Sequence, residues 1–228
     1  MRDKAEAIGM QVAQAVLMVA VSLDVGLRLR YRTDTPASVF DRTVSPGATM
    51  NATGVLGWGP QYVARELGQA LERPARTRRA ILSLELFAAA RLEANERTRF
   101  VTAVSALEPL AEQSDLGPEV RAFVERALRD CRADSSIPAG IRQSLECRLM
   151  QLRQESIRQS LRRLCEEWFP GDSAARNALD RAYSLRSEIL HEGRADPDLL
   201  LDSELQSVSR YLRKVYAKEF DLQLLKPA

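Results

Sequence analysis

The sequence predicts a mainly α-helical fold, a helical bundle that carries a small N-terminal extension with minor β structure. From Pro60 onward, apolar residues recur at the spacing of helices. Prolines and Asp172 stand where helices characteristically begin. Apolar residues make up 45% of the 228 and charged residues 28%, a balance typical of globular proteins. We expect residues 1–60 to form the extension and residues 61–228 to form the helical domain.

The extension contains most of the glycine, threonine and turn-like clusters of the chain. Five apolar residues alternate there with polar residues or glycine: Leu23, Val25, Leu27, Leu29 and Tyr31. This period of two is typical of a half-buried strand. We therefore expect a small β element, paired with the segment 39–44.

The stretch from Ile8 to Leu23 is apolar enough to suggest a signal peptide or a membrane helix. It is too short for a membrane span, Gln11 and Gln14 interrupt it, and Asp24 closes it. We interpret it as core or interface and expect no membrane partner.

Seven helices are expected in the rest of the chain. Pro60 and Pro118 suit first-turn positions, and Asp172 suits an N-cap. The predicted ranges are 60–72, 77–94, 96–113, 118–132, 139–169 with a break near Glu155, 173–192 and 200–219. Three apolar stripes are predicted to be core: Phe100, Val104, Leu107 and Ala111; Val120, Phe123, Ala127 and Cys131; and Leu205, Val208, Leu212 and Val215.

The net charge of +2 does not indicate a nucleic-acid partner for the whole molecule. Locally, ten arginines stand between Arg121 and Arg163 against five acidic residues: Glu125, Asp130, Asp134, Glu146 and Glu155. Their alternation favours a salt-bridged surface, and a patch that contacts RNA is the alternative.

The cysteine and histidine residues limit the kinds of metal site and disulfide that the sequence can form. The three cysteines form no C-x-x-C pair, and the chain has a single histidine, so the pattern does not favour a zinc site. The odd cysteine number also argues against a secreted disulfide scaffold. We expect a cytoplasmic protein without a cofactor.

That single histidine, His191, lies near the end of the predicted helix 173–192, two residues before Gly193. One interpretation is a cation that stabilises the negative end of the helix dipole, with Gly193 ending the helix. Arg186 precedes it by five residues, which corresponds to about 140° of helical rotation. The second interpretation is therefore that a long arginine and a helix-end histidine converge on one phosphate.

The segment Arg186-Ser-Glu-Ile-Leu-His191 resembles the R-x4–6-H signature of the HEPN superfamily, and of the ApeA-like HEPN domains within it. Tyr183 lies about one helical turn before the arginine. A weaker similarity lies upstream, in the segment RFVTAVSALEPL, through Phe100, Leu107 and Glu108. The two similarities together cover roughly residues 77–220.

The resemblance implies a HEPN-like helical bundle that forms a homodimer and acts as a metal-independent endoribonuclease. It also implies a role in prokaryotic defence or stress response, as in antiviral defence systems and toxins. Arg186 and His191 would be catalytic, with Tyr183, Ser187 and Glu108 in support. Imidazole exchanges protons near neutral pH and guanidinium matches phosphate oxygens, which suits RNA cleavage by the 2′-hydroxyl.

Several alternatives stay open. Ser187 stands where many active members carry Asn, Asp or His, which favours a non-catalytic HEPN module that binds RNA or a protein partner through the N-terminal extension. A plain helical interaction protein with a chance motif is the third class. Tyr183 is either a core aromatic or a phosphate ligand, and Glu108 either orients Arg186 or lies exposed on a helix.

Overall fold

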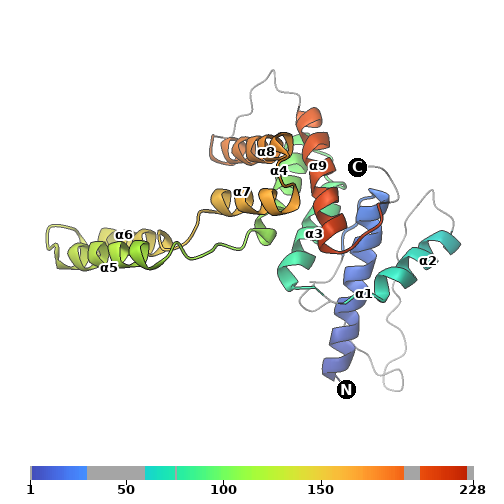
Figure 1. Ribbon diagram of the computed structural model, residues 1–228, viewed down its shortest axis with the longest axis horizontal. Coiled ribbons are helices and arrows are strands. Elements are labelled where there is room, and N and C mark those ends of the chain that lie inside the picture. The colour runs from blue at the N-terminus through green and yellow to red at the C-terminus, as the bar shows by residue number, and fades with distance from the viewer. Residues whose placement is uncertain (1, 30–59, 75, 193–200, 225–228) are drawn as a thin grey trace. The chain divides into compact units, whose positions relative to one another are not determined.

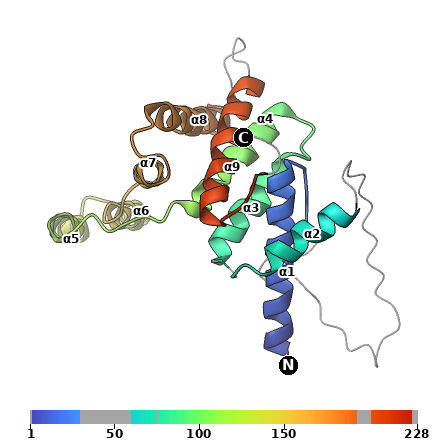
Figure 2. The same ribbon diagram turned by 45° about the vertical axis from the view of Figure 1, so that its right-hand side comes forward.

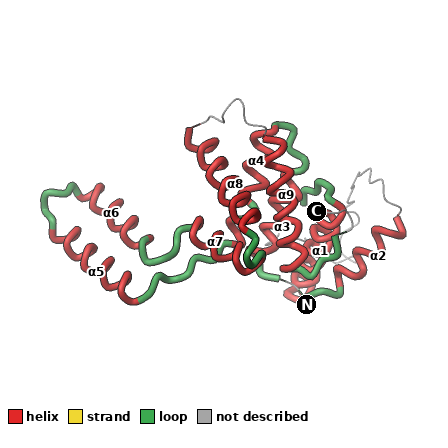
Figure 3. The backbone as a smooth tube through the Cα atoms, turned by 45° about the horizontal axis from the view of Figure 1, so that its top comes forward, coloured by secondary structure: helices red, strands yellow, loops and turns green. Residues whose placement is uncertain are grey.

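The computed structural model describes residues 2–29, 60–74, 76–192 and 201–224. These residues form nine α-helices and one short 3-10 helix, and none of them lies in a β-strand (Figures 1 and 3). The elements are α1 (Arg2–Leu23), α2 (Pro60–Leu71), α3 (Arg78–Ala90), α4 (Glu96–Ser105), η1 (Glu108–Leu110), α5 (Pro118–Ala133), α6 (Ala139–Gln151), α7 (Ile157–Trp168), α8 (Ser173–Glu192) and α9 (Leu201–Glu219).

The chain divides into two compact units. Unit 1 contains Met1–Leu110 and Arg181–Ala228, and unit 2 contains Ala111–Asp180, so the division falls within α8. The expected division near residue 60 lies at the end of the segment 30–59, outside the described residues, and stays a prediction.

The predicted helical character is confirmed. Helices α2, α5, α8 and α9 begin and end within one residue of the expected ranges. Pro118 occupies the first turn of α5, and Asp172 accepts a hydrogen bond from the backbone N–H of Ala175 at 2.9 Å, as an N-cap does.

Two expected helices are shorter than predicted, and a third is broken. The helix expected over 77–94 corresponds to α3, which ends at Ala90. The helix expected over 96–113 ends at Ser105 and gives way to η1. Pro109 explains this, because proline lacks a backbone N–H and disfavours helical geometry at the residue before it. The helix expected over 139–169 is broken, as anticipated near Glu155. Ser156 starts α7 there through a reciprocal capping box with Gln159.

The predicted strand at the end of the first segment is wrong for the residues that the structure describes. Leu23 is the last residue of α1, and residues 24–29 contain no strand. Asp24 ends α1 in the left-handed region with φ 57°, and the N–H of Val25 returns to the carbonyl of Ala20 at 2.9 Å. The remainder of the proposed β element, including the segment 39–44, lies outside the described residues.

After α1 the chain runs beside the end of α3. Leu27 donates to the carbonyl of Ala88 at 3.1 Å. A Cβ atom at Gly26 would lie 2.6 Å from a side-chain carbon of Leu92, so a larger residue would require the Leu92 side chain to shift. Close packing on a helix, and not strand pairing, therefore explains the apolar residues of this segment.

Helix α1 is a core element of unit 1: most residues from Ala13 to Leu23 are buried, as the interpretation as core or interface allows, whereas Ile8 and Val12 are exposed. It packs against α2, α3 and α9 (Figure 2). Gln14 is buried, and its amide joins the carbonyl of Pro74 and the N–H of Arg76. The glutamine that interrupts the apolar run thus satisfies backbone groups after α2. No helix in the described part of the chain is long and apolar enough to cross a membrane.

Helix α9 completes the core of unit 1. Its predicted stripe of Leu205, Val208, Leu212 and Val215 is buried, and so are Phe100, Val104 and Leu107 near α4. The hydroxyl of Tyr216, fully buried, donates to the carbonyl of Ser83 at 3.1 Å. Burial raises the pKa of this phenol, and the group therefore stays neutral as a hydrogen-bond donor.

Arg213 of α9 is also buried, with 3% of its surface exposed. Its Nε donates to the carbonyl of Val21 at 3.2 Å and its Nη2 to that of Ser22 at 3.1 Å. These carbonyls belong to the last turn of α1, where the regular i to i−4 hydrogen bonds of the helix end. The guanidinium of Arg213 in α9 thus caps the C-terminal end of α1.

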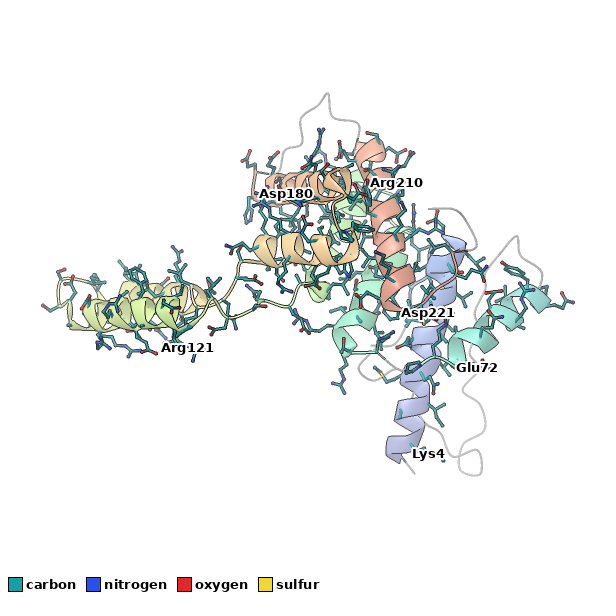
Figure 4. All side chains as sticks on the ribbon, in the orientation of Figure 1. Lys4, Glu72, Arg121, Asp180, Arg210 and Asp221 are labelled. Atoms are coloured by element: carbon teal, nitrogen blue, oxygen red, sulfur yellow. The ribbon has the colours of Figure 1, made fainter. Side chains whose placement is uncertain are left out.

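Unit 2 contains an antiparallel hairpin of α5 and α6 (Figure 3), followed by α7 and the first half of α8. In the second part, Arg158 binds both carboxylate oxygens of Asp180 at 2.7 Å, and Arg162 binds the same oxygens at 3.1 and 3.0 Å (Figure 4). The bonds from Arg158 are the main cause of a pKa of Asp180 well below its ordinary value.

The predicted core stripe of α5 is wrong at one position. Val124 and Leu128 are buried, whereas Phe123 is 56% exposed. Val120, Ala127 and Cys131 are half-buried. Within the hairpin, α5 has only one neighbouring helix, α6. Helix α6 covers a narrower face of α5 than the apolar stripe of the sequence occupies.

We predict that Arg213→Met lowers the free energy of unfolding by about 2 kcal/mol, because two buried carbonyls lose a charged donor. Urea denaturation of the full chain measures this. The matched control is Arg210→Met on the exposed side of α9 (Figure 4), which should change stability by no more than about 0.5 kcal/mol. Equal effects of the two variants would show that the cap is not important.

Candidate functional site

The residues singled out by the motif lie in the part of α8 that belongs to unit 1. Ala182 and Leu185 are buried there and fix the inward face of the helix. Tyr183, Arg186 and Ser187 are half-buried, and His191 is exposed in the last turn. Tyr183, Arg186 and Ser187 therefore lie beside the buried face of the helix, and His191 lies away from it.

Arg186 is held in one place by three groups. Its Nη1 lies 3.0 Å from Oε1 of Glu108, and its Nε donates to Oγ of Ser105 at 3.4 Å. The guanidinium also lies over the ring of Tyr183, 5.9 Å from the ring centre. Only 19% of the arginine side chain is exposed, so its position is determined by packing as well as charge.

Glu108 takes the first of its two expected positions, as the ion-pair partner of Arg186. Its side chain is 28% exposed and lies in η1. Pro109 ends regular helix at this point, and the resulting turn places the carboxylate toward α8. The break in the helix therefore contributes to the site.

Ser105 was not among the residues predicted for the site. It is the last residue of α4 and stands three positions before Glu108. A serine or threonine one turn before a glutamate is common in helices, so the sequence offered no specific signal for this contact. Arg181, also not predicted, pairs with Glu204 at 2.9 Å and joins α8 to α9.

Tyr183 contacts Arg186 with its ring face, which agrees with an aromatic that supports the arginine. Ser187 follows Arg186 on the half-buried side of α8. Leu190, one turn farther along, is an exposed large apolar residue. Together Ser187, Leu190 and His191 form a surface near the end of α8.

His191 has no hydrogen bond or ion pair with any residue in the described part of the chain, and none joins it to Arg186. Five helical residues separate the two side chains by about 140° of rotation and about 7.5 Å of rise. A single chain thus presents the guanidinium and the imidazole on different sides of one helix. Gly193, the expected stop, lies outside the described residues.

No group of three or more metal-ligating side chains occurs among the residues that the structure describes. Cys131, Cys147 and Cys165 are free thiols. Burial raises the pKa of the Cys165 thiol to about 11, which leaves it protonated and unreactive at neutral pH.

We predict that Arg186 and Glu108 stabilise each other by about 1 kcal/mol, because the pair is largely screened from water yet still reaches the surface. The measurement is a double-mutant cycle with Arg186→Met, Glu108→Gln and the combined variant in urea. A coupling energy near zero would mean that the contact does not hold α8 in place.

No protein-family model matches this chain, and searches of curated proteins and of solved structures find no significant match.

Proposed function

We propose that unit 1 is a metal-independent endoribonuclease of HEPN type, with Arg186 and His191 as its catalytic residues. The observation that carries the proposal is that one helix holds both an arginine fixed by its neighbours and the single histidine of the chain. The histidine is exposed at the end of that helix. As the resemblance implies, we place the protein in prokaryotic defence or stress response, acting in the cytoplasm.

The chemistry requires three contributions. A base removes the proton of the 2′-hydroxyl, an acid protonates the leaving 5′-oxygen, and positive charge stabilises the phosphorane between them. Imidazole suits the first two tasks because it exchanges protons near neutral pH. Guanidinium suits the third because its fixed donors match phosphate oxygens.

The contacts of Arg186 are compatible with this task. Nη1 binds Glu108 and Nε binds Ser105, whereas Nη2 has no hydrogen bond within the described residues. Glu108 thereby fixes the plane of the guanidinium and leaves one donor group for a phosphate oxygen.

One chain does not place the two side chains together, so the proposal includes a homodimer. A twofold axis beside the end of α8 repeats its surface on both sides of the interface. Two copies of His191 then supply separate acid and base groups, while the exposed Leu190 provides apolar contact between the helices.

A non-catalytic HEPN module that binds RNA or a protein partner is the second candidate. The ion pair with Glu108 favours it, because a paired carboxylate offsets the charge that a phosphorane would need. Ser187 favours it as well, since active relatives in the superfamily often carry a different residue after the arginine.

We predict that the full chain cuts single-stranded RNA in excess EDTA and leaves 2′,3′-cyclic phosphate ends. His191→Ala should reduce the rate by about 10² to 10⁴. Arg186→Lys should be strongly impaired, because ammonium loses the planar fork. A DNA analogue should resist cleavage, because it lacks the attacking hydroxyl.

Arg181→Lys is the matched control in the cleavage assay, since Arg181 lies on α8 but pairs with Glu204 instead of the site. Circular dichroism checks folding of each variant. Cutting that survives in His191→Ala, or that EDTA abolishes, would exclude the mechanism.

We predict that Leu190→Glu weakens self-association through α8 and lowers cleavage in parallel, because it places a charge in the apolar centre of the interface. Light scattering over a range of protein concentrations measures the first effect, and the cleavage assay measures the second. A strictly monomeric wild type with full nuclease activity would exclude the dimeric site.

A further inference from the structure

The α5–α6 hairpin of unit 2 exposes an apolar surface that the proposed nuclease site does not use. Phe123 and Ile141 are each 56% exposed, and Leu145 and Leu152 are exposed as well. Only Val124 and Leu128 of the hairpin helices are buried. The hairpin therefore has more apolar surface than its own two-helix contact covers.

The exposed residues form one stripe on each helix. On α5, Glu119, Phe123, Arg126 and Asp130 follow the spacing i, i+4, i+7 and i+11. On α6 and its C-cap, Ile141, Leu145, Arg148 and Leu152 follow the same spacing. Residues at this spacing share one face of a helix.

Both stripes lie on the same side of the hairpin. Some residues of α5 and α6 face the other helix of the hairpin, and we call these the contact positions. One common groove is lined by residues that directly follow contact positions: Arg121 and Glu125 of α5 and Met150 of α6. On each helix, the residues directly before and directly after a contact position project to opposite sides. Because the two helices are antiparallel, the residues before the contact positions of both helices therefore lie together on the side opposite the groove. Phe123 precedes the buried Val124, and Leu145 precedes the half-buried Glu146. We call this opposite side the apolar face.

Most charges on the groove side are paired within the chain, Arg129 being an exception within the described residues. Arg121 binds Asp115 at 2.7 Å, Arg132 binds Glu146 at 2.9 Å, and Arg153 lies 3.6 Å from Glu125. Arg121 is labelled in Figure 4. Most charges on this side of the hairpin thus have ionic partners already.

The charges of the apolar face have no such partners. Glu119, Arg126 and Asp130 of α5 and Arg148 of α6 form no ion pair or hydrogen bond through their side chains within the described residues. Two acids and one arginine give the α5 stripe a charge of −1, and the single arginine gives the α6 stripe +1. The face thus combines four apolar and four charged side chains, is neutral in total, and is divided into halves of opposite sign.

We propose that the apolar face binds the same face of a second copy of this chain, forming an intermolecular four-helix bundle. A twofold axis parallel to the helices places α5 of each copy against α6 of the other. The negative stripe then meets the positive stripe twice, and Phe123 enters the partner's apolar stripe as an aromatic anchor. A nucleic acid would need a net positive face, which the hairpin does not offer there.

The antiparallel register supports the same pairing. Asp115 and Gln154 form a bridge at the base of the hairpin, with Leu116 donating to the carbonyl of Arg153 at 2.9 Å. This bridge brings the start of α5 level with the end of α6. Glu119 therefore comes within reach of Arg148 of the partner subunit in the twofold assembly.

The proposal is independent of the nuclease site, which lies in unit 1. The test is the mass of the full chain by sedimentation equilibrium, with Leu145→Glu and Ile141→Glu on the apolar face. Each should raise the dissociation constant of the hairpin interface at least about tenfold. Met150→Glu is the matched control, since Met150 is 46% exposed on the groove side of the same helix, and it should associate like the wild type.

Charge reversal supplies a second test that does not depend on apolar contacts. Glu119→Arg and Arg148→Glu should each weaken association, and the combined variant should restore it, because the two residues exchange signs across the interface. Circular dichroism verifies that each variant keeps its helices. Restoration would not occur if either residue acted only within its own helix.

Combining these variants with Leu190→Glu separates the two interfaces. If Leu190→Glu leaves the hairpin association intact, the proposal holds even when the α8 dimer fails. A monomeric wild type, an unchanged mass in both Leu145→Glu and Ile141→Glu, or equal loss in Met150→Glu would each overturn the proposal.

Discussion

The buried guanidinium of Arg213 connects the two ends of the described chain, and the core of unit 1 depends on this contact. Burial lowers the pKa of this arginine, while the Asp24 carboxylate opposes the shift. The cost of burying the charge is offset by its hydrogen bonds to the carbonyls of Val21 and Ser22 at the end of α1. Because α9 also packs on α4, fixing α1 to α9 fixes the helix that leads to η1.

The same kind of contact, nearer the surface, creates the candidate site. Arg186 is held by Ser105, the last residue of α4, and by Glu108 just after it, so the core determines where α8 presents its guanidinium. An arginine used in this way is well oriented but partly neutralised. The catalytic proposal depends on the orientation of the Arg186 guanidinium, and the binding proposal is compatible with its partial neutralisation. The next residue, Ser187, favours the binding proposal, because many active members of the superfamily carry a different residue there.

The hairpin of unit 2 follows a different principle. Each of its helices has only one helical neighbour within the hairpin, so apolar residues outside that contact, such as Phe123 and Ile141, stay exposed. On the groove side, Arg121, Arg132 and Arg153 pair within the chain, whereas the charges of the apolar face have no ion pair within the described residues.

Helical periodicity, Pro118 and Asp172 determined the helices after residue 60, because local spacing and capping chemistry act within a few residues. The motif likewise identified Arg186 and His191 without reference to any contact. Tertiary structure alone decided that Leu23 ends a helix instead of starting a strand, since α3 and α9 bury that end of α1. It also placed Glu108 and Ser105 on Arg186, and left Phe123 exposed. Each of these outcomes depends on residues distant in sequence, whose proximity no local pattern encodes.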